Sequence, residues 1–433
     1  MAIASPNTST SAPASTSGQS YGAPLATVTT LFFMWGFLTC LNDILVPHLK
    51  SIFDLTYTKV MLIQFAFFGA YFIFSIPSAK IIDAIGYQRS MVVGLLTMGV
   101  GAFLFVPAAS VPSYPLFLGA LIVLAAGITC LQVAANPYVT ILGKPETASS
   151  RLNLTQAFNS LGTFLAPFFG GLFILTTAPN MTEIRALAPD ALQAFRVHEA
   201  ATVKMPYVGL GIALVLLAIA IGSFKLPKIE HAQHPRGQKV NDSIWKHPNL
   251  IFGAIAIFVY VGAEVSIGSF LVNYFSQPEI GGLTEKVAAS FVAFYWGGAM
   301  VGRFIGSALL QKMKTGGLLA TCAVCAAGLV ALSMLTTGHF AMYSIILVGF
   351  FNSIMFPSIF TLGVAELGPL TGDGSGIMIM AIVGGALIPV AQGWIADHIG
   401  IHHAFFLPVI CYLYILFFAL SGSKPNSERY GKA

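Results

Sequence analysis

Charge is scarce in this chain. Asp, Glu, Lys and Arg make up only 9% of its 433 residues, whereas hydrophobic residues make up 56%, and the mean hydropathy is +0.81. A soluble protein of this length needs a charged, hydrated surface, so the composition excludes that class. An all-α polytopic membrane protein is predicted instead, because a helix satisfies its own backbone polar groups inside the bilayer.

Groups typical of enzymes are also missing. The loops contain neither an acidic cluster of the DDxxD type nor a metal-binding spacing of His, Asp and Glu, and His402-His403 alone is too little. These absences argue against an intramembrane enzyme such as a lipid-linked glycosyl or prenyl transferase. Large ligand-binding loops are missing too, which argues against a receptor. We therefore predict no enzyme activity, no cofactor and no metal.

Cysteine is rare, and all five cysteines fall inside apolar stretches. Cys322 and Cys325 have the spacing of a redox or metal pair, but no partner cluster accompanies them. Packing inside a helix is the predicted role of both thiols.

Long apolar runs are what the chain does have. A membrane-spanning helix needs about 20 mostly apolar residues. Such runs predict twelve spans, near residues 24–48, 58–82, 90–108, 115–140, 154–176, 205–225, 250–275, 285–311, 317–336, 340–364, 374–397 and 403–421. The predicted outward loop at about 177–204 has room for a short surface helix.

Basic residues indicate how the chain is oriented. With both termini cytoplasmic, fourteen of the 21 Lys and Arg lie on the cytoplasmic side, six lie outside and Arg303 lies within a span. This positive-inside bias predicts cytoplasmic termini and makes a nucleic-acid partner unnecessary to explain the net charge of +5.

The longest polar cytoplasmic stretch divides the spans into two sets of six. The predicted units are a disordered Ser/Thr/Ala/Pro-rich tail that is not a signal peptide, an N-terminal six-helix half, a cytoplasmic linker, a C-terminal six-helix half and a cytoplasmic tail. They cover residues 1–22, 23–226, 227–248, 249–422 and 423–433.

Glycine and proline spacings repeat between the halves. Pro137 and Gly143 recur as Pro357 and Gly363, at an offset of 220 residues. Gly162, Pro167 and Gly171 recur as Gly384, Pro389 and Gly393, at an offset of 222 residues. One Asp-x-x-Gly also occurs twice, as Asp83–Gly86 and Asp397–Gly400. Repeated six-helix halves with a central linker are the architecture of major facilitator transporters, whose substrate site lies at the midplane. The close glycine pairs predict either tight helix packing or bending at moving interfaces.

Two carboxylates, Asp43 and Glu264, fall well inside predicted spans. A charge near the bilayer centre costs about 2.5–3.5 kcal/mol on insertion scales, so it persists where it meets water, a partner or a proton. Both are predicted to load and unload protons. The alternative is a structural carboxylate paired with a base such as Arg303. Arg303 itself is predicted to snorkel or to cap a cytoplasmic gate, and Asp83 with Arg89 to clamp the loop between spans two and three.

Amides are frequent inside the spans. The predicted binding residues are amides together with Asp43 and two aromatics near span eight, namely Asn42, Asp43, Gln64, Gln132, Asn136, Gln156, Asn159, Asn273, Tyr295, Trp296 and Asn352. Asn153, Gln156 and Asn159 are spaced by three and are predicted to share one helix face. Amides both donate and accept, as sugar hydroxyls do, so with nearby aromatic rings they favour a neutral polyol ligand.

Four segments carry a family resemblance: FMWGFLTCLNDILVPHL, MLIQFAFFGAYF, LQVAANPYVTILG and SSRLNLTQAFNSLGTFLAPFFG. They closely resemble the fucose:proton symporter family of the major facilitator superfamily, and within it the bacterial glucose/galactose transporter branch. The resemblance covers nearly the whole chain after the tail. It implies that Asp43 takes part in sugar binding and coupling, and that Gln132, Asn136, Gln156 and Asn159 contribute to the sugar site.

One departure from the family pattern bears on coupling. The fucose symporter has a glutamate in its span-four motif, LETAANP, where this chain has Gln132, which cannot titrate. Its span-seven motif has a glutamine where this chain has Glu264. The resemblance thus suggests that the second carboxylate has moved to the other half, unless Asp43 couples alone or the ion is sodium.

These observations predict a proton-coupled hexose symporter of the bacterial inner membrane, monomeric, with a sugar, a proton and the lipid bilayer as partners. The alternatives are a sodium-coupled or passive carrier, or a carrier for fucose or N-acetylglucosamine. The residues do not decide which hexose is carried.

Overall fold

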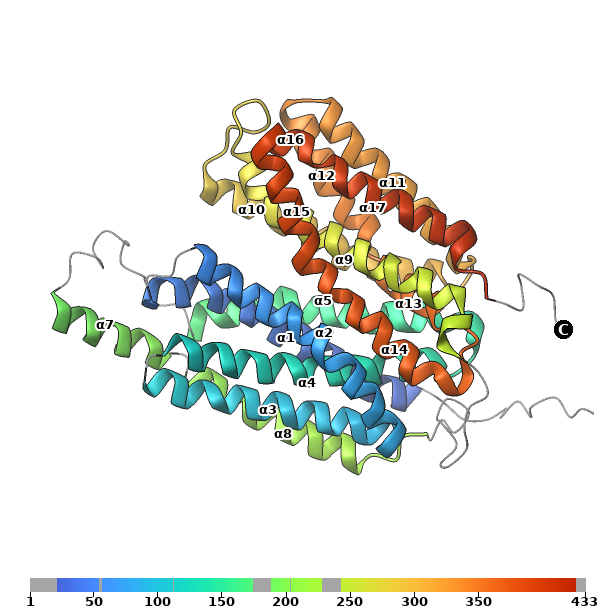
Figure 1. Ribbon diagram of the computed structural model, residues 1–433, viewed down its shortest axis with the longest axis horizontal. Helices are drawn as coiled ribbons and strands as arrows, with labels where there is room; N and C mark the ends of the chain where they lie inside the picture. Colours follow the sequence, from blue (N-terminus) through green and yellow to red (C-terminus); the bar gives the residue numbers. More distant parts are fainter. Residues whose placement is uncertain are drawn as a thin grey trace, which may run out of the picture.

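The structure, a computed structural model, describes residues 22–53, 57–111, 113–173, 188–202, 204–227 and 243–425. The first half of the chain forms seven α-helices and one short 3₁₀ turn among these residues (Figure 1). They are α1 (Gly22–Phe53), α2 (Tyr57–Ile85), α3 (Tyr87–Ser110), α4 (Tyr114–Ile141), η1 (Pro145–Thr147), α5 (Ala148–Phe173), α7 (Pro189–Thr202) and α8 (Lys204–Ser223).

The second half begins after the gap at 228–242 and has more interrupted helices. Its elements are η3 (Ile244–Lys246), α9 (Pro248–Phe275), α10 (Glu285–Leu309), α11 (Thr315–Leu335), α12 (Gly338–Asn352), α13 (Met355–Gly363), η4 (Gly368–Leu370), α14 (Thr371–Met380), η5 (Ala381–Val383), α15 (Gly384–Ile399), α16 (Ile401–Ala404), α17 (Phe406–Phe417) and η6 (Phe418–Gly422). Predicted spans ten and eleven are thus each broken, at residues 353–354 and 381–383.

Eleven helical segments of the described chain are long and apolar enough to cross a membrane. α5, which packs along α1, is the twelfth helix of the fold. The predicted fold class is therefore confirmed. The expected short surface helix in the loop at 177–204 is α7.

The two halves repeat one packing scheme. In the first half, α3 packs on α4 and on α8, α1 on α5, and α2 on α4. The equivalent pairs of the second half are α11 with α12 and with α17, α9 with α15, and α10 with α12. The duplication inferred from glycine and proline spacing is therefore present in the helix contacts as well.

Two repeated glycines explain why the spacing is kept. A Cβ atom on Gly162 of α5 would overlap the carbonyl of Phe33 in α1, and one on Gly384 of α15 would overlap the carbonyl of Phe258 in α9. Close backbone approach is the main attraction between helices in lipid, where no hydrophobic force drives them together. Tight packing, the first of the two predicted roles, describes these two positions.

The repeated Asp-x-x-Gly also has one structural role. Gly86 and Gly400 lie directly before α3 and α16, with φ of 83° and 86°. L-residues rarely adopt this backbone region, so glycine is favoured at both turns.

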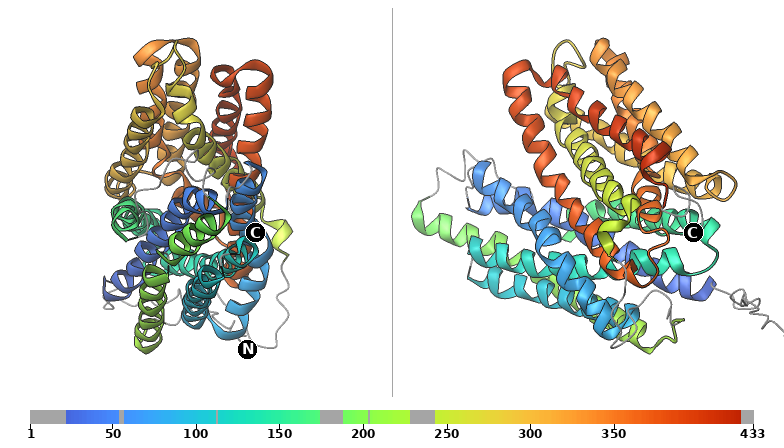
Figure 2. Two further views of the ribbon diagram at one scale, coloured as in Figure 1. Left: turned by 90° about the vertical axis from the view of Figure 1, so that its left-hand side faces the viewer. Right: turned by 45° about the vertical axis from the view of Figure 1, so that its right-hand side comes forward.

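The halves meet at one end of the molecule and splay apart at the other (Figures 1 and 2). We call the meeting end the linker end, because the end of α8 and the start of α9, which flank the linker in the chain, lie there (Figure 1). The largest contacts between the halves are two seams, α5 with α10 and α2 with α14, and α14 also packs on α4. The repeat relates one seam to the other, because α10 corresponds to α2 and the span formed by α14 and α15 corresponds to α5.

Close packing predicts an asymmetric response to glycine substitution. Gly384→Ala should lower the stability of the purified protein by about 1–3 kcal/mol, because the new methyl group overlaps backbone that cannot move freely. Gly297→Ala in α10 is the matched control, since a Cβ atom there meets nothing within 4 Å. Thermal unfolding in detergent measures both. Equal melting temperatures for the two variants would contradict the packing role of Gly384.

Candidate functional site

The second half contains a closed network of buried hydroxyls around Asn352. The Asn352 amide donates to the Tyr295 hydroxyl at 2.9 Å and accepts from the Tyr412 hydroxyl at 2.8 Å. The Tyr260 hydroxyl donates to the Asn352 backbone carbonyl at 3.0 Å. Asn352 therefore ties α9, α10 and α17 to α12, and both ends of its amide are used inside the protein.

Glu264 lies next to this network, but its carboxylate is only partly paired. The Tyr295 hydroxyl donates to the Glu264 backbone carbonyl at 3.3 Å, and the Tyr260 phenol lies beside the Glu264 carboxylate. The carboxylate oxygen Oε1 is buried and has no hydrogen-bond partner. Arg303 is the cation that acts on this carboxylate, but the two side chains form no ion pair in the described part of the chain. Glu264 is thus not locked against a guanidinium.

Three buried amide side chains of the first half have polar atoms without a hydrogen-bond partner. Gln132 of α4 donates to the Tyr71 hydroxyl at 2.7 Å, but its carbonyl oxygen has no partner. Neither amide atom of Asn136 has a partner, and the Gln156 nitrogen has none. These three side chains are at most 4% exposed. An unsatisfied buried polar atom costs roughly 1–3 kcal/mol, so a set of them indicates groups kept for something other than stability.

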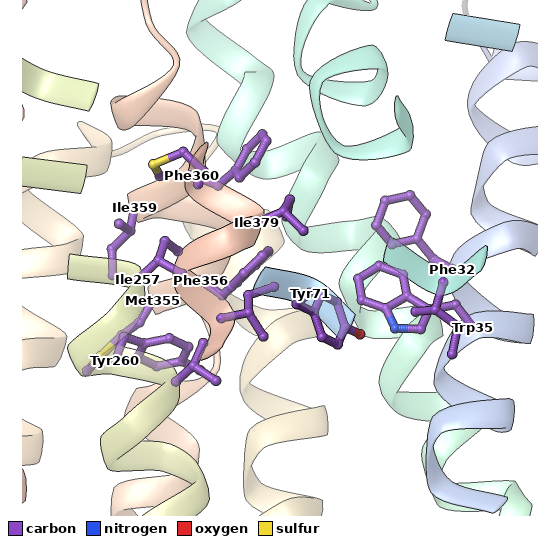
Figure 3. Close-up of a cluster of buried hydrophobic side chains, with 14 of the residues drawn as sticks. Phe32, Trp35, Tyr71, Ile257, Tyr260, Met355, Phe356, Ile359, Phe360 and Ile379 are labelled. Atoms are coloured by element: carbon purple, nitrogen blue, oxygen red, sulfur yellow. The ribbon is translucent and has the colours of Figure 1, made fainter. Parts of the chain in front are cut away.

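Tyr71 stands where the two halves face each other. Its ring lies among the labelled side chains of both halves in Figure 3, with Phe32 and Trp35 of α1 on one side and Phe356 of α13 on the other. Its neighbours in α2, Phe67 and Phe68, hold rings 5.6 and 6.4 Å away between centroids. The hydroxyl that Gln132 contacts is therefore held at the contact between the halves.

The predicted amide row on α5 divides between two neighbours. The amide of Asn153 donates to the Arg303 carbonyl across the seam at 2.6 Å, whereas the amide of Asn159 donates to the Phe32 carbonyl of α1 at 2.9 Å. Three residues turn a helix by 300°, so each step moves the side chain about 60° around the axis. Gln156 lies between the two directions, which explains why its amide nitrogen is left without a partner.

Arg303 crosses the seam at the linker end. Its Nη1 donates to the Ser160 hydroxyl and, at 3.4 Å, to the Gln156 carbonyl, while its Nε donates to the Ser353 carbonyl at 3.4 Å. The predicted gate position of Arg303 thus corresponds to contacts with α5 of the other half.

Serine and threonine extend the same seam. The Ser150 hydroxyl donates to the Ser307 carbonyl at 2.7 Å, and the Ser307 hydroxyl donates back to the Ser150 carbonyl at 3.2 Å. Ser149 contacts the Thr361 hydroxyl at 2.6 Å and accepts from Thr315 at 3.0 Å. We call this set of contacts, together with those of Asn153 and Arg303, the polar seam.

The second seam is built from small residues. A Cβ atom on Gly376 of α14 would lie 3.0 Å from the Ala79 Cβ of α2, and one on Gly372 would lie 3.4 Å from an Asp83 carboxylate oxygen. The Asp83–Arg89 clamp stays a prediction. Arg89 is exposed in the first turn of α3, and a carboxylate oxygen of Asp83 faces Gly372 of the other half.

The remaining predicted site residues lie away from these contacts, or their side chains are not among the described residues. Asn273 is exposed near the far end of α9, and the Trp296 ring packs toward Gly268 of α9. Asn42, Asp43 and Gln64 lie in the helical backbone of α1 and α2, but their side chains fall outside the described residues. Their roles stay predictions.

The sequence reasoning missed Tyr260 and Tyr412. Tyr260 carried a signal, because it precedes Glu264 by four residues and therefore shares its helix face. Tyr412 carried none, since it lies in an apolar span far along the chain. The five cysteines are free thiols, and the described residues hold no group of three His, Cys, Asp or Glu arranged for a metal ion.

Comparison with known proteins identifies the group to which this architecture corresponds. Residues 27–382 match the family model described as Major Facilitator Superfamily. A glucose/galactose transporter of Brucella abortus (strain 2308) is 55% identical, over 94% of this chain and 96% of that protein. The L-fucose-proton symporter of Escherichia coli (strain K12) is 35% identical, over 93% of each chain.

Solved structures agree. The crystal structure of the E. coli fucose:proton symporter in the outward conformation superposes with a TM-score of 0.85 at 33% identity, covering 94% of this chain and all of that one. A variant of the same symporter gives a TM-score of 0.87 at 32% identity. The resemblance predicted from the four sequence segments is confirmed.

We expect the loss of a fully hydrogen-bonded amide to destabilise the protein more than the loss of an amide with an unpaired atom. Asn352→Ala should lower stability by roughly 1–3 kcal/mol, because the buried Tyr412 hydroxyl loses its acceptor. Gln156→Ala should change stability less, since its amide nitrogen has no partner to lose. Thermal unfolding of both variants tests this. A larger loss for Gln156→Ala would show that its amide is structural.

Proposed function

The chain belongs to the major facilitator superfamily, in the fucose:proton symporter family, and from this premise we propose that it is a proton-coupled hexose symporter working by alternating access. Relatives at 55% and 35% identity are named a glucose/galactose transporter and an L-fucose-proton symporter. Both names support a sugar as the substrate of this chain, and the second also supports a proton as its coupling ion.

The observation that carries the proposal is the unsatisfied set of polar atoms. Gln132, Asn136 and Gln156 each keep at least one unpaired amide atom, and Glu264 keeps an unpaired carboxylate oxygen. Sugar hydroxyls donate and accept at once, which is what a mixed set of amide nitrogens and oxygens requires. Few fixed charges accompany them, so a neutral ligand is favoured over an ionic one.

The arrangement of the halves supports loading from the side opposite the linker. The linker end is sealed by the polar seam and by the small-residue seam, while the helices splay at the other end (Figure 1). The positive-inside bias supports a cytoplasmic position of the linker end. The bacterial relatives support the inner membrane as the location of the protein. Sugar and proton would enter from outside, and release would follow opening of the linker end.

Two carboxylates are proposed to couple sugar to the proton. Asp43 in α1 is assigned by resemblance, and Glu264 in α9 by its lack of an ion-pair partner. One charge moving across about 100 mV is worth about 2.3 kcal/mol. This supports roughly 50-fold accumulation, at about 1.36 kcal/mol for each factor of ten.

Gradient-driven uptake tests the coupling ion. Purified protein in proteoliposomes should accumulate labelled glucose or galactose when the lumen is alkaline, and a protonophore should abolish accumulation. Competition by unlabelled glucose, galactose, fucose and N-acetylglucosamine ranks the substrates. Uptake that ignores the pH gradient and follows sodium would show that the proton assignment is wrong, and uptake that follows neither would indicate a passive carrier.

Charge-removing variants test the two carboxylates. Asp43→Asn and Glu264→Gln should each abolish accumulation, while sugar counterflow survives in at least one of them, because exchange needs no net proton movement. Asp397→Asn is the matched control, since Asp397 is exposed at the end of α15. Unchanged accumulation in both test variants would contradict the coupling assignment.

A further inference from the structure

Glu264 and Arg303 project toward the same region from neighbouring helices. α9 and α10 are consecutive helices that pack against each other and run in opposite directions. Side chains on a helix tilt toward its N-terminus, so Glu264 leans toward the linker end and Arg303 leans away from it. The Tyr260 phenol, one turn nearer the N-terminus of α9, lies beside the Glu264 carboxylate and agrees with this direction.

The hydrogen-bond acceptors of Arg303 in the described part of the chain are all neutral. They are the Ser160 hydroxyl and the Gln156 carbonyl on α5, and the Ser353 carbonyl within its own half. A half-buried guanidinium held by neutral groups depends strongly on a nearby anion, because the low dielectric gives little other compensation. Among the described residues that anion is Glu264.

The titratable groups around Glu264 in the described residues are Arg303 and the phenols of Tyr260, Tyr295 and Tyr412. The hydrogen-bond acceptors that α5 offers to Arg303 are the Ser160 hydroxyl and the Gln156 backbone carbonyl. The side chain of Asp43 in α1 is not among the described residues.

We propose that Arg303 transmits the charge of Glu264 to the polar seam, so that protonation of Glu264 loosens the linker end. The proposal rests on the proposed proton coupling and assigns its mechanical step to one residue. With Glu264 ionised, the guanidinium is compensated and bridges α10 to α5. With Glu264 protonated, an uncompensated cation remains at the seam, and opening of the linker end relieves it by admitting water.

The direction fits symport. A proton taken up from outside destabilises the closed linker end of the loaded carrier, and its release to the cytoplasm restores the attraction that closes this end again. Arg303 is thus a positioning residue between the ion and the conformational change. It need not touch sugar.

Distance measurements across the linker end test this step. Spin labels at Glu146→Cys and Lys312→Cys, both exposed and one on each half, report the opening in a background whose five native cysteines are replaced. In the parent protein, in lipid nanodiscs without sugar, lowering the pH from about 8 to about 5 should raise the long-distance population about threefold or more.

Variants at Glu264 and Arg303 test whether the pH response depends on both residues. Arg303→Gln and Glu264→Gln should each give a distribution that no longer changes with pH, while Arg303→Lys, which keeps the charge, should retain part of the response. Lys80→Gln, at an exposed cation on α2, should behave as the parent. A full pH response in either Arg303→Gln or Glu264→Gln would overturn the proposal.

Ser160→Ala provides a milder test in case the charge variants do not fold. Loss of the α5 acceptor should raise the long-distance population already at about pH 8, because the bridge is weakened even with Glu264 ionised. A distribution identical to the parent's would count against the bridge. Because no sugar is present, a failure here is separate from a failure of gradient-driven uptake, which tests the proposed function itself.

Discussion

A polar atom inside the bilayer must find a partner or keep access to water, and this constraint shapes the whole molecule. Backbone groups meet it by forming helices. Side chains meet it unevenly: the hydroxyls around Asn352 are all paired, whereas Asn136, Gln156 and Glu264 retain unpaired atoms. The first group holds four helices of one half together. The second is where a hydroxyl-rich ligand and a proton could supply the missing partners.

The two halves are alike in packing and different in how they touch. Equivalent helix pairs recur in each half, and the two seams between the halves are equivalent to each other. Yet α5 and α10 meet through several hydrogen bonds, while α14 and α2 approach closely at Gly376 and Ala79. α14 also donates one hydrogen bond to the other half, from the Ser375 hydroxyl to the Val133 carbonyl of α4 at 2.8 Å. Opening the linker end therefore breaks hydrogen bonds on both sides, and more of them in the polar seam.

The fold was largely readable from the sequence because lipid imposes long apolar runs and close glycine contacts. Gly162 and Gly384, paired by spacing alone, carry the same helix contact, and Gly86 and Gly400 make the same turn. The site was less readable. Spacing by three placed Asn153 and Asn159 on one face, but the 60° drift at each step sends them to different partners. Tyr412 could not be found, because only the folded chain brings it to Asn352.

The need for hydrogen-bond and charge partners also bears on why the second carboxylate lies at Glu264 and not at position 132. Gln132 donates its amide to the Tyr71 hydroxyl, a bond that a carboxylate could not donate while ionised. Glu264 lies in the half that also holds Arg303, so its charge has a counter-ion nearby that forms no permanent pair with it. Placing the acid at 264 keeps acid and base on adjacent helices, and leaves the base free to reach across to α5, where the halves must separate.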